Sequence, residues 1–315
     1  MSCKNFNATE INIDSINVVK LDQVELFDVR RVFDCGQCFR FDPVTNSRHE
    51  TEFAGCAFGK YISVAQDGGT VYIYNSTLEE FESVWCRFLG LDRDYSEIND
   101  SILSLSKNPA LTDAVSTASG IRILKQDEWE SICSFIISQN NNIPRIKKLV
   151  AALCARCGEK IDVSSMQSHV ADVHKNNELC AYSFPTPESV AALGIDGLAE
   201  LKVGFRAKYI FDAAQKMSGG EIDIAALTSL ADTQECIKLL CTVKGIGPKV
   251  ASCALLFGFA RLDAFPVDVW IKRVMAKYFD EDFDPASLGA YAGIAQQYLF
   301  YYERYLISDS GEDKK

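Results

Sequence analysis

One ten-residue stretch of the chain reads TVKGIGPKVA and holds two glycines, Gly245 and Gly247. Glycine allows positive φ angles and close approach of a second backbone, as a tight turn between two helices requires. Upstream, Asp232 and Glu235 have capping-box spacing, and Pro248 suits the first turn of a following helix. The pattern predicts a helix-hairpin-helix whose second helix presents free N–H groups to an anion such as a DNA phosphate. The alternative is a Gly-x-Gly turn that only ends a helix.

Lys249 lies in the first turn of that second helix, and Asp268 follows further along the chain. A lysine amine can attack a sugar carbon only when neutral, and the positive end of a helix favours the neutral form. Asp268 precedes a helical pattern and is a candidate N-cap. A carboxylate held there stays ionised and can stabilise positive charge on a sugar while a glycosidic bond breaks. Capping alone is the alternative for Asp268, but its combination with Lys249 favours catalysis.

The first third of the chain predicts an antiparallel sheet. Residues 60–65 and 70–74 alternate apolar and polar side chains and are joined across the turn signal DGG, which favours a hairpin. Helical patterns dominate the remainder. We therefore expect an α+β fold with an N-terminal antiparallel β-sheet domain followed by a mostly α-helical domain, over residues 10–118 and 119–308, with an insertion at about 155–183.

Composition restricts the class of protein. The 315 residues are 48% hydrophobic, enough for a large core, yet no apolar run approaches the ~20 residues of a membrane span. The N-terminus MSCKNF lacks the pattern of a secretion signal. The twelve cysteines lie largely in apolar stretches and are expected to be reduced core residues. These features favour an intracellular protein, located in the nucleus if the organism is eukaryotic and in the cytoplasm if it is prokaryotic.

The net charge of −11 counts against nucleic-acid binding, because phosphate affinity usually comes with a basic domain. The distribution of charge points the other way. Acidic residues gather in the N-terminal part and in the tail DSGED, whereas basic residues surround the hairpin: Lys202, Arg206, Lys208, Lys244, Lys249, Lys272, Arg273 and Lys277. We expect a small basic footprint on an acidic body, with Lys272 and Lys277 equally consistent with solvated helix faces.

Four further segments accompany the hairpin in a fixed order: DCGQCFRF at 34–41, SQNNNIPRI at 138–146, VGFRAKY at 203–209 and YAGIAQQYLF at 291–300. The ordered set resembles the helix-hairpin-helix DNA glycosylases, and within them the 8-oxoguanine DNA glycosylases, over nearly the whole chain. The resemblance implies a sheet domain and a glycosylase domain with an active-site cleft between them. It also implies a bifunctional DNA glycosylase and AP lyase that excises 8-oxoguanine opposite cytosine from duplex DNA in base excision repair.

The resemblance assigns the chemistry to Lys249 and Asp268. Lys249 would attack C1′ of the damaged nucleoside and form a Schiff base that undergoes β-elimination, while Asp268 would stabilise the cationic sugar. No cofactor and no metal are implied. The expected partner is double-stranded DNA containing oxidised guanine, bound by a monomer and away from any membrane.

A base pocket follows from the same resemblance. Gly36 would offer its carbonyl to the N7 hydrogen that 8-oxoguanine has and guanine lacks, a contact that a side chain would block. Phe300 and Cys253 would sandwich the flipped base, and Gln296 would bond its Watson–Crick edge. Without the resemblance, Phe300 would be assigned to the helix core and Cys253 to core filling.

The resemblance also implies a set of DNA contacts. Phe205 has the shape of an intercalating wedge, and Asn140, Arg145 and Arg206 resemble readers of the opposite cytosine. From the residues alone, Arg145 could be a solvated helix charge and Asn140 a turn residue. The hairpin would contribute phosphate contacts at Gly245 and Gly247.

Two departures from the family pattern leave alternatives open. Trp270 stands where many relatives carry a histidine that contacts phosphate, and an indole offers one neutral N–H and no charge. The insertion carries spacings that resemble a zinc finger, at Cys154, Cys157, His169, His174 and Cys180, although the first two also continue an amphipathic helix. The rival functions are a glycosylase for another lesion, a non-catalytic binder of damaged DNA and a zinc-dependent scaffold.

Overall fold

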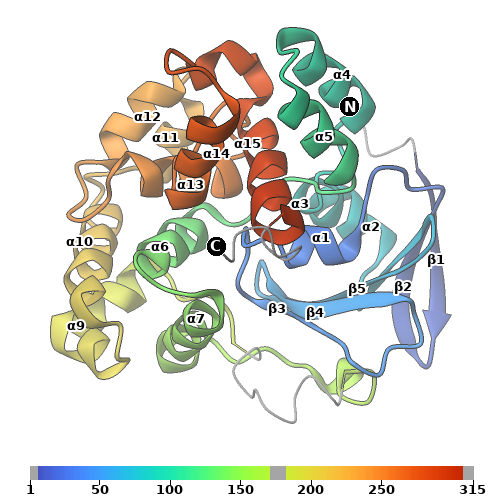
Figure 1. Ribbon diagram of the computed structural model, residues 1–315. Coiled ribbons are helices and arrows are strands. Elements are labelled where there is room, and N and C mark those ends of the chain that lie inside the picture. The colour runs from blue at the N-terminus through green and yellow to red at the C-terminus, as the bar shows by residue number, and fades with distance from the viewer. Residues whose placement is uncertain (1–5, 171–181, 308–315) are drawn as a thin grey trace.

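The computed structural model describes residues 6–170 and 182–307. Its N-terminal part is a six-stranded antiparallel sheet in the order β1-β2-β6-β5-β4-β3 (Figure 1). The strands are β1 (Asn7–Ile13), β2 (Ile16–Asp22), β3 (Phe41–Pro43), β4 (Thr51–Ala57), β5 (Lys60–Asp67) and β6 (Thr70–Tyr74). The predicted hairpin is the β5–β6 pair, closed where Asp67 pairs with Thr70.

The inner face of the sheet packs against short helices: α1 (Val29–Phe33), α2 (Leu78–Glu80), a π-helical turn (Phe81–Trp85) and α3 (Cys86–Phe88). Aromatic rings fill this core, and the rings of Phe33 and Phe41 stack with centroids 4.4 Å apart. Helix α2 follows the last strand and begins at a capping box, in which Thr77 and Glu80 bond each other's backbone N–H groups. Helices α2 and α3 and the π-helical turn between them lead from the sheet to the helical part of the chain.

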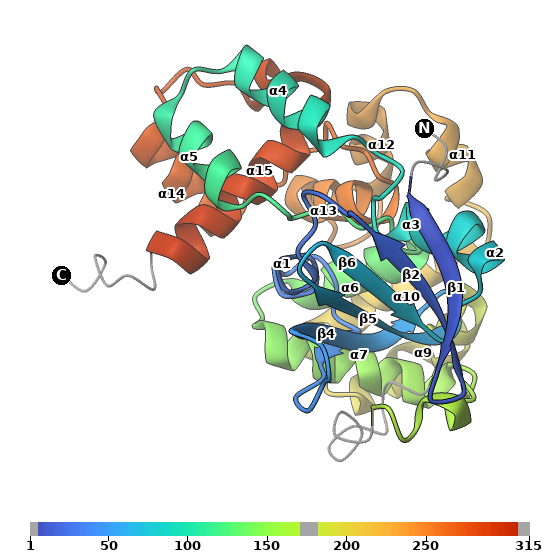
Figure 2. The ribbon, with the colours of Figure 1, turned by 90° about the vertical axis from the view of Figure 1, so that its right-hand side faces the viewer.

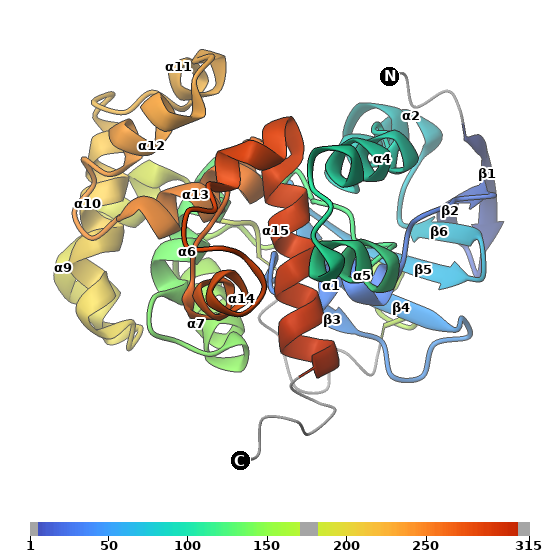
Figure 3. The same cartoon turned by 45° about the horizontal axis from the view of Figure 1, so that its top comes forward.

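The remainder of the chain is helical, which confirms the predicted α+β class. Its helices are α4 (Tyr95–Leu105), α5 (Pro109–Thr117), α6 (Glu128–Ser138), α7 (Ile143–Cys157), α9 (Pro187–Glu200), α10 (Ala207–Ser218), α11 (Ile224–Ser229), α12 (Thr233–Leu240), α13 (Pro248–Gly258), α14 (Val269–Tyr278) and α15 (Ala292–Tyr301). Helices α4, α5, α14 and α15 lie together beside the sheet (Figure 2). Helix α15 runs between the sheet-bearing part and α6, α7 and α13 (Figure 3).

The predicted helix-hairpin-helix is formed by α12 and α13. Asp232 caps α12 by accepting the N–H of Gln234, and not through the expected capping box with Glu235. Gly245 has φ +81°, and a Cβ there would lie 2.4 Å from the ring of Tyr209. The turn therefore needs glycine both for its backbone angle and for its contact with α10.

The predicted insertion covers the outer face of the sheet. Residues 161–170 follow α7, and Met166 and Val170 are buried there with the sheet side chains Tyr61 and Tyr74. His169 bonds the carboxylate of Glu52 at 2.7 Å. This segment completes a hydrophobic core that the sheet alone would leave open on one side.

Within residues 6–170 and 182–307, no group of three metal-ligating side chains comes together, so these residues do not form the zinc site that the spacings in the insertion allowed. Cys154 and Cys157 belong to α7, as the amphipathic pattern indicated, and His169 is engaged by Glu52. The two remaining candidates, His174 and Cys180, lie outside the described residues.

Among the residues that the structure describes, nine cysteines are free thiols and seven of these are buried, in keeping with the expectation of reduced core residues. The expectation of a reduced thiol is wrong at Cys86, which is disulfide-bonded. Across the described ranges no helix has the length and apolar character needed to cross a membrane.

Candidate functional site

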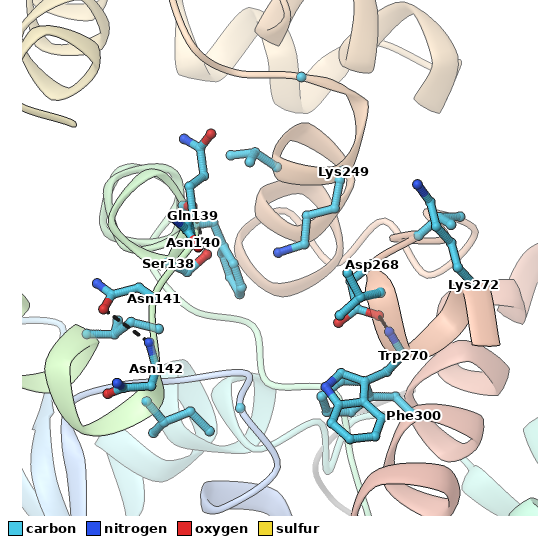
Figure 4. A pocket seen from close by; sticks show the side chains of 18 of the residues that line it. Ser138, Gln139, Asn140, Asn141, Asn142, Lys249, Asp268, Trp270, Lys272 and Phe300 are labelled. Atoms are coloured by element: carbon cyan, nitrogen blue, oxygen red, sulfur yellow. Dashed lines mark hydrogen bonds between the residues drawn. The ribbon is translucent and has the colours of Figure 1, made fainter. Parts of the chain in front are cut away.

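A cavity of about 850 Å³ opens between the loop that joins α6 to α7, the first turns of α13 and α14, and the end of α15. Figure 4 shows Lys249, Asp268, Trp270 and Phe300 on one side, facing the asparagine-rich loop across the space. A smaller pocket of about 70 Å³ continues inward from it. Lys249, Asp268, Gly36 and Phe300 line both, so they mark the passage from the open cavity to the inner pocket.

Lys249 and Asp268 come from the N-terminal ends of two neighbouring helices. Lys249 is in the first turn of α13, with its amine 5.9 Å from the ring centroid of Phe135. Asp268 is the N-cap of α14, where one carboxylate oxygen accepts the N–H groups of Trp270 and Ile271, each at 2.9 Å. These bonds fix the position of the carboxylate beside the cavity.

Cys253 lies one helical turn after Lys249 and is buried. Burial raises the pKa of the Cys253 thiol, while the charge of Lys249 and a hydrogen bond with it act in the opposite direction. The negative charge of Asp268 also raises that pKa, so the three groups share one electrostatic environment. A thiol kept neutral is an apolar surface suited to packing against a ring.

The inner pocket brings together residues from opposite ends of the chain. Gly36 has φ +83° and faces the pocket, while Gln296 and Phe300 reach it from α15. Gln296 is only 4% exposed, and its Oε1 is a buried acceptor without a hydrogen-bond partner in the part of the chain that the structure describes. A buried amide oxygen left unbonded is costly, which points to a ligand as its partner.

Sequence reasoning missed the side chains that hold Gly36 in place. The buried side chain of Gln37 donates to the carbonyls of Val32 and Arg122 at 2.8 and 2.9 Å and accepts the N–H of Leu124 at 2.9 Å. Gln297 donates to the carbonyl of Cys35 at 3.1 Å. Gln37 stands in the segment DCGQCFRF, but nothing in a single sequence tells a buried glutamine that fixes a turn from an exposed one.

Two ion pairs, one buried and one half-buried, join the sheet part to the helices that carry the cavity. Arg40 pairs with Glu130 of α6 at 3.0 Å, and Lys147 of α7 pairs with Asp42 at 2.9 Å. Burial raises the pKa of Glu130, and the neighbouring Arg40 acts against that rise. Both pairs anchor the helices on either side of the asparagine-rich loop.

The asparagine-rich loop is held in its conformation by Arg206. Asn140 is exposed with φ +48°, and the guanidinium of Arg206 donates to the carbonyls of Gln139, Asn140 and Val203. Arg206 is buried and does not line the cavity, although the prediction gave it a direct contact with a base. Arg145, by contrast, is exposed in the first turn of α7.

Phe205 projects from the rim beside this loop. It is 48% exposed, its ring meets that of Tyr209 edge-on, and Arg206 lies 4.5 Å from its centroid. An apolar ring this exposed next to a cavity has the placement that a wedge requires. Across the cavity, Gly247 caps α13 without a side-chain hydrogen bond, which leaves the helix N–H groups open.

Two family models match consecutive parts of the chain. Residues 18–132 match the N-terminal domain of 8-oxoguanine DNA glycosylase, and residues 133–286 match the HhH-GPD superfamily of base excision DNA repair proteins. Among curated proteins, the N-glycosylase/DNA lyase OGG1 of Arabidopsis thaliana is 31% identical over 213 residues, which are 62% of this chain and 55% of that protein. The chain thus spans about half the length of this curated relative.

Solved structures extend the likeness over the whole fold. MBOgg1 in complex with a low-affinity DNA ligand is 37% identical with a TM-score of 0.81, covering 95% of this chain and 98% of its own. The 8-oxoguanine glycosylase/lyase of Clostridium acetobutylicum, in complex with double-stranded DNA that has cytosine opposite 8-oxoguanine, is 35% identical with the same TM-score and the same coverage. With its cavity, its hairpin and this likeness over nearly its full length, the chain belongs to the helix-hairpin-helix family of 8-oxoguanine DNA glycosylases.

Proposed function

We propose that the protein is a bifunctional DNA glycosylase and AP lyase that excises 8-oxoguanine opposite cytosine from duplex DNA. The observation that carries the proposal is the position of an amine and a carboxylate, Lys249 and Asp268, at the mouth of a pocket that Gln296 also lines, with an amide oxygen left unbonded among the described residues. Base excision requires a nucleophile, a group that stabilises positive charge and a group that hydrogen-bonds the edge of the planar base.

The glycosylase step follows from this arrangement. The neutral amine of Lys249 attacks C1′, the bond from C1′ to the base nitrogen breaks, and the base leaves with the bonding electrons and takes up the proton that the lysine nitrogen loses. Asp268 lowers the energy of the cationic sugar because the two N–H groups of α14 hold its carboxylate in place beside the reacting carbon. The bond from C1′ to the ring oxygen then breaks, the ring oxygen takes up a proton from water, and a protonated Schiff base remains on Lys249.

The lyase step uses the same covalent intermediate. Loss of a proton from C2′ drives cleavage of the C3′–O bond, so the 3′ phosphate leaves and the strand is broken. Water finally releases the sugar fragment from Lys249. The Schiff base acts as the electron sink for this elimination.

Recognition of the base is assigned to the inner pocket. The carbonyl of Gly36 would accept the N7 hydrogen of 8-oxoguanine, Gln296 would bond the Watson–Crick edge, and Phe300 and Cys253 would lie on the two faces of the ring. Guanine has a lone pair at N7 in place of that hydrogen, so it would meet the Gly36 carbonyl with repulsion. Phe205 would fill the space left in the duplex, and Asn140 and Arg145 would contact the opposite cytosine. Arg206 would act on that cytosine indirectly, by holding the loop that carries Asn140.

Borohydride trapping tests the proposal. The wild-type protein should give a covalent adduct with duplex DNA containing 8-oxoguanine opposite cytosine, and Lys249→Gln should give none while still binding the duplex. Asp268→Asn should slow base release by about 10²–10³-fold, the size of effect seen when one charge-stabilising group is lost. Lys107→Gln, at an exposed lysine after α4, is the matched control and should trap like wild type. An adduct that persists in Lys249→Gln would overturn the assignment.

A further inference from the structure

The turn between α12 and α13 is held from outside by one face of α10. Gly245 lies against the ring of Tyr209, where an added Cβ would come within 2.4 Å of a ring atom. About one helical turn further along α10, the carboxylate of Asp212 accepts the backbone N–H of Lys244 at 2.7 Å. Side chains three or four positions apart lie on the same helix face, so one side of α10 supplies both contacts.

Lys216 extends this contact by another turn of α10. Its amine donates to the carbonyl of Thr242 at 2.6 Å, and it lies 3.6 Å from the carboxylate of Asp212 and 3.4 Å from that of Glu221. Asp212 and Lys216 thus bond an N–H and a carbonyl of the same turn with side chains of opposite charge. The turn is fixed at both kinds of backbone group by one helix.

The bond from Asp212 also affects which backbone N–H groups of the turn are open to a ligand. The N–H of Lys244 is engaged by Asp212, and the N–H of Ile246 bonds the carbonyl of Val243 at 3.0 Å. Among the described residues no side chain caps α13 at Gly247, so the first N–H groups of that helix point outward unbonded. The engaged groups hold the turn, and the open ones face the solvent.

Helix α10 is connected to the predicted wedge as well. Phe205 stands just before the helix, and its ring meets that of Tyr209 edge-on with centroids 5.8 Å apart. Tyr209 therefore touches Phe205 on one side and Gly245 on another. The distance between the wedge and the hairpin is set by contacts that all start from α10.

We propose that Asp212, together with Lys216, is a positioning residue that holds the α12–α13 turn on α10, so that the hairpin and Phe205 meet duplex DNA as one preformed unit. A preformed site binds more tightly, because less conformational freedom is lost on binding. The inference rests on the proposed function, since it takes the hairpin and Phe205 to contact DNA.

The sign of one mutational effect separates this role from simple electrostatics. A carboxylate close to a DNA-binding surface repels phosphates, so its charge alone predicts that Asp212→Ala binds DNA more tightly. The positioning role predicts the opposite, a loss of about fivefold in affinity, the effect of one ordinary hydrogen bond. Asp212→Asn keeps an oxygen that can accept the N–H of Lys244 and should bind at least as tightly as wild type.

Affinity is measured with a duplex containing a non-cleavable tetrahydrofuran abasic site opposite cytosine, well below the melting temperature of each variant. Lys216→Met should also weaken binding, because it removes the donor to the carbonyl of Thr242. Asp196→Ala, at an exposed carboxylate of α9, is the matched control and should show no loss of affinity.

A kinetic measurement tests whether the effect is confined to binding. In a single turnover at saturating protein, Asp212→Ala should release 8-oxoguanine at close to the wild-type rate, since the bound complex regains the same contacts. Unchanged or tighter binding by Asp212→Ala, or an equal loss in Asp212→Asn, would overturn the inference. Borohydride trapping of the wild-type protein is measured in parallel, so that failure of the proposed enzyme activity is recognised separately from failure of the positioning role.

Discussion

At the scale of single residues, two adjacent glutamines of α15 have opposite effects on stability. Gln297 donates to the carbonyl of Cys35 at 3.1 Å, whereas the Oε1 of Gln296 is buried and unbonded within the described part of the chain. The first interaction ties α15 to the turn that holds Gly36. The second is a cost to the fold that a bound base would remove, since its ring supplies the missing donor.

Replacing these glutamines with methionine should therefore separate stability from function. Gln296→Met should raise the free energy of unfolding by roughly 1 kcal/mol, because it removes an unsatisfied buried acceptor at similar volume, and it should lower excision of 8-oxoguanine. Gln297→Met should lower the free energy of unfolding by about the same amount. Urea denaturation of the two variants gives the comparison, and destabilisation by Gln296→Met would mean that its amide is bonded in the free protein.

The two arginines that were predicted to contact the opposite cytosine differ in exposure, since Arg145 is exposed and Arg206 is buried. Arg145→Gln, at an exposed position, should reduce the preference for cytosine by about 1–3 kcal/mol while excision opposite cytosine changes less. Arg206→Gln should lower excision opposite all four bases, because it releases the loop carbonyls of Gln139 and Asn140. Excision rates on four duplexes that differ only in the opposite base measure both effects. A uniform loss in Arg145→Gln would assign that arginine to phosphate.

At the scale of elements, the hairpin between α12 and α13 is built on two glycines with different requirements. Gly245 has a positive φ and touches the ring of Tyr209, so both backbone and packing exclude a side chain. Gly247 has φ −104°, and a Cβ there would meet nothing within 4 Å. The first glycine thus belongs to the fold, and the second opens the end of α13 to a ligand.

Alanine at each position should separate the two requirements. Gly245→Ala should lower the free energy of unfolding by roughly 2 kcal/mol or more, from backbone strain and overpacking against α10. Gly247→Ala should change stability by less than about 0.5 kcal/mol yet weaken DNA binding, because its methyl group would stand between the helix N–H groups and a phosphate. Thermal melting and binding to duplex DNA check the pair, and equal loss of stability in both variants would contradict the distinction.

At the scale of the whole molecule, the segment after α7 is fastened to the outer face of the sheet by a buried polar cluster. Glu52 accepts from Ser47, Ser63 and His169, and the ring of His169 stacks on Tyr74 with centroids 4.1 Å apart. Burial alone would raise the pKa of Glu52, but these hydrogen bonds outweigh it, and the pKa lies below its ordinary value. The contact between residues 161–170 and the outer face of the sheet therefore depends on an ionised Glu52.

The free energy of unfolding should fall at acid pH as Glu52 becomes protonated. Because the folded-state pKa of Glu52 is lowered, its stabilisation is complete above the ordinary value of roughly 4.3 and is lost as the pH falls through the folded value. Glu52→Gln should cost roughly 3 kcal/mol at pH 7 and make the acid loss of stability shallower. Urea unfolding between pH 3 and pH 7 measures this, with exposed Glu79→Gln as the control. An equally steep acid loss in Glu52→Gln would place the titrating group elsewhere.

The sequence by itself determined the features that depend on neighbouring residues. The β5–β6 turn, the capped start of α14 at Asp268 and the glycine hairpin were all predicted, because turn angles and helix caps are decided within a few residues. Alternating runs in the first third and helical patterns in the remainder predicted the α+β class, and the order of motifs gave the family resemblance, which implied the same fold. The same reasoning predicted that Lys249 would lie in the first turn of α13.

Tertiary structure alone decided which distant groups meet. Gln297 and Cys35 are 262 positions apart, and only packing of α15 against the sheet part brings the base pocket together. The burial of Arg206 against the loop carbonyls and the seating of His169 on Glu52 likewise depend on contacts between separate elements. A sequence records which side chains can donate or accept, but the choice among partners is made by the free energy of burying them, and that is set by the assembled core.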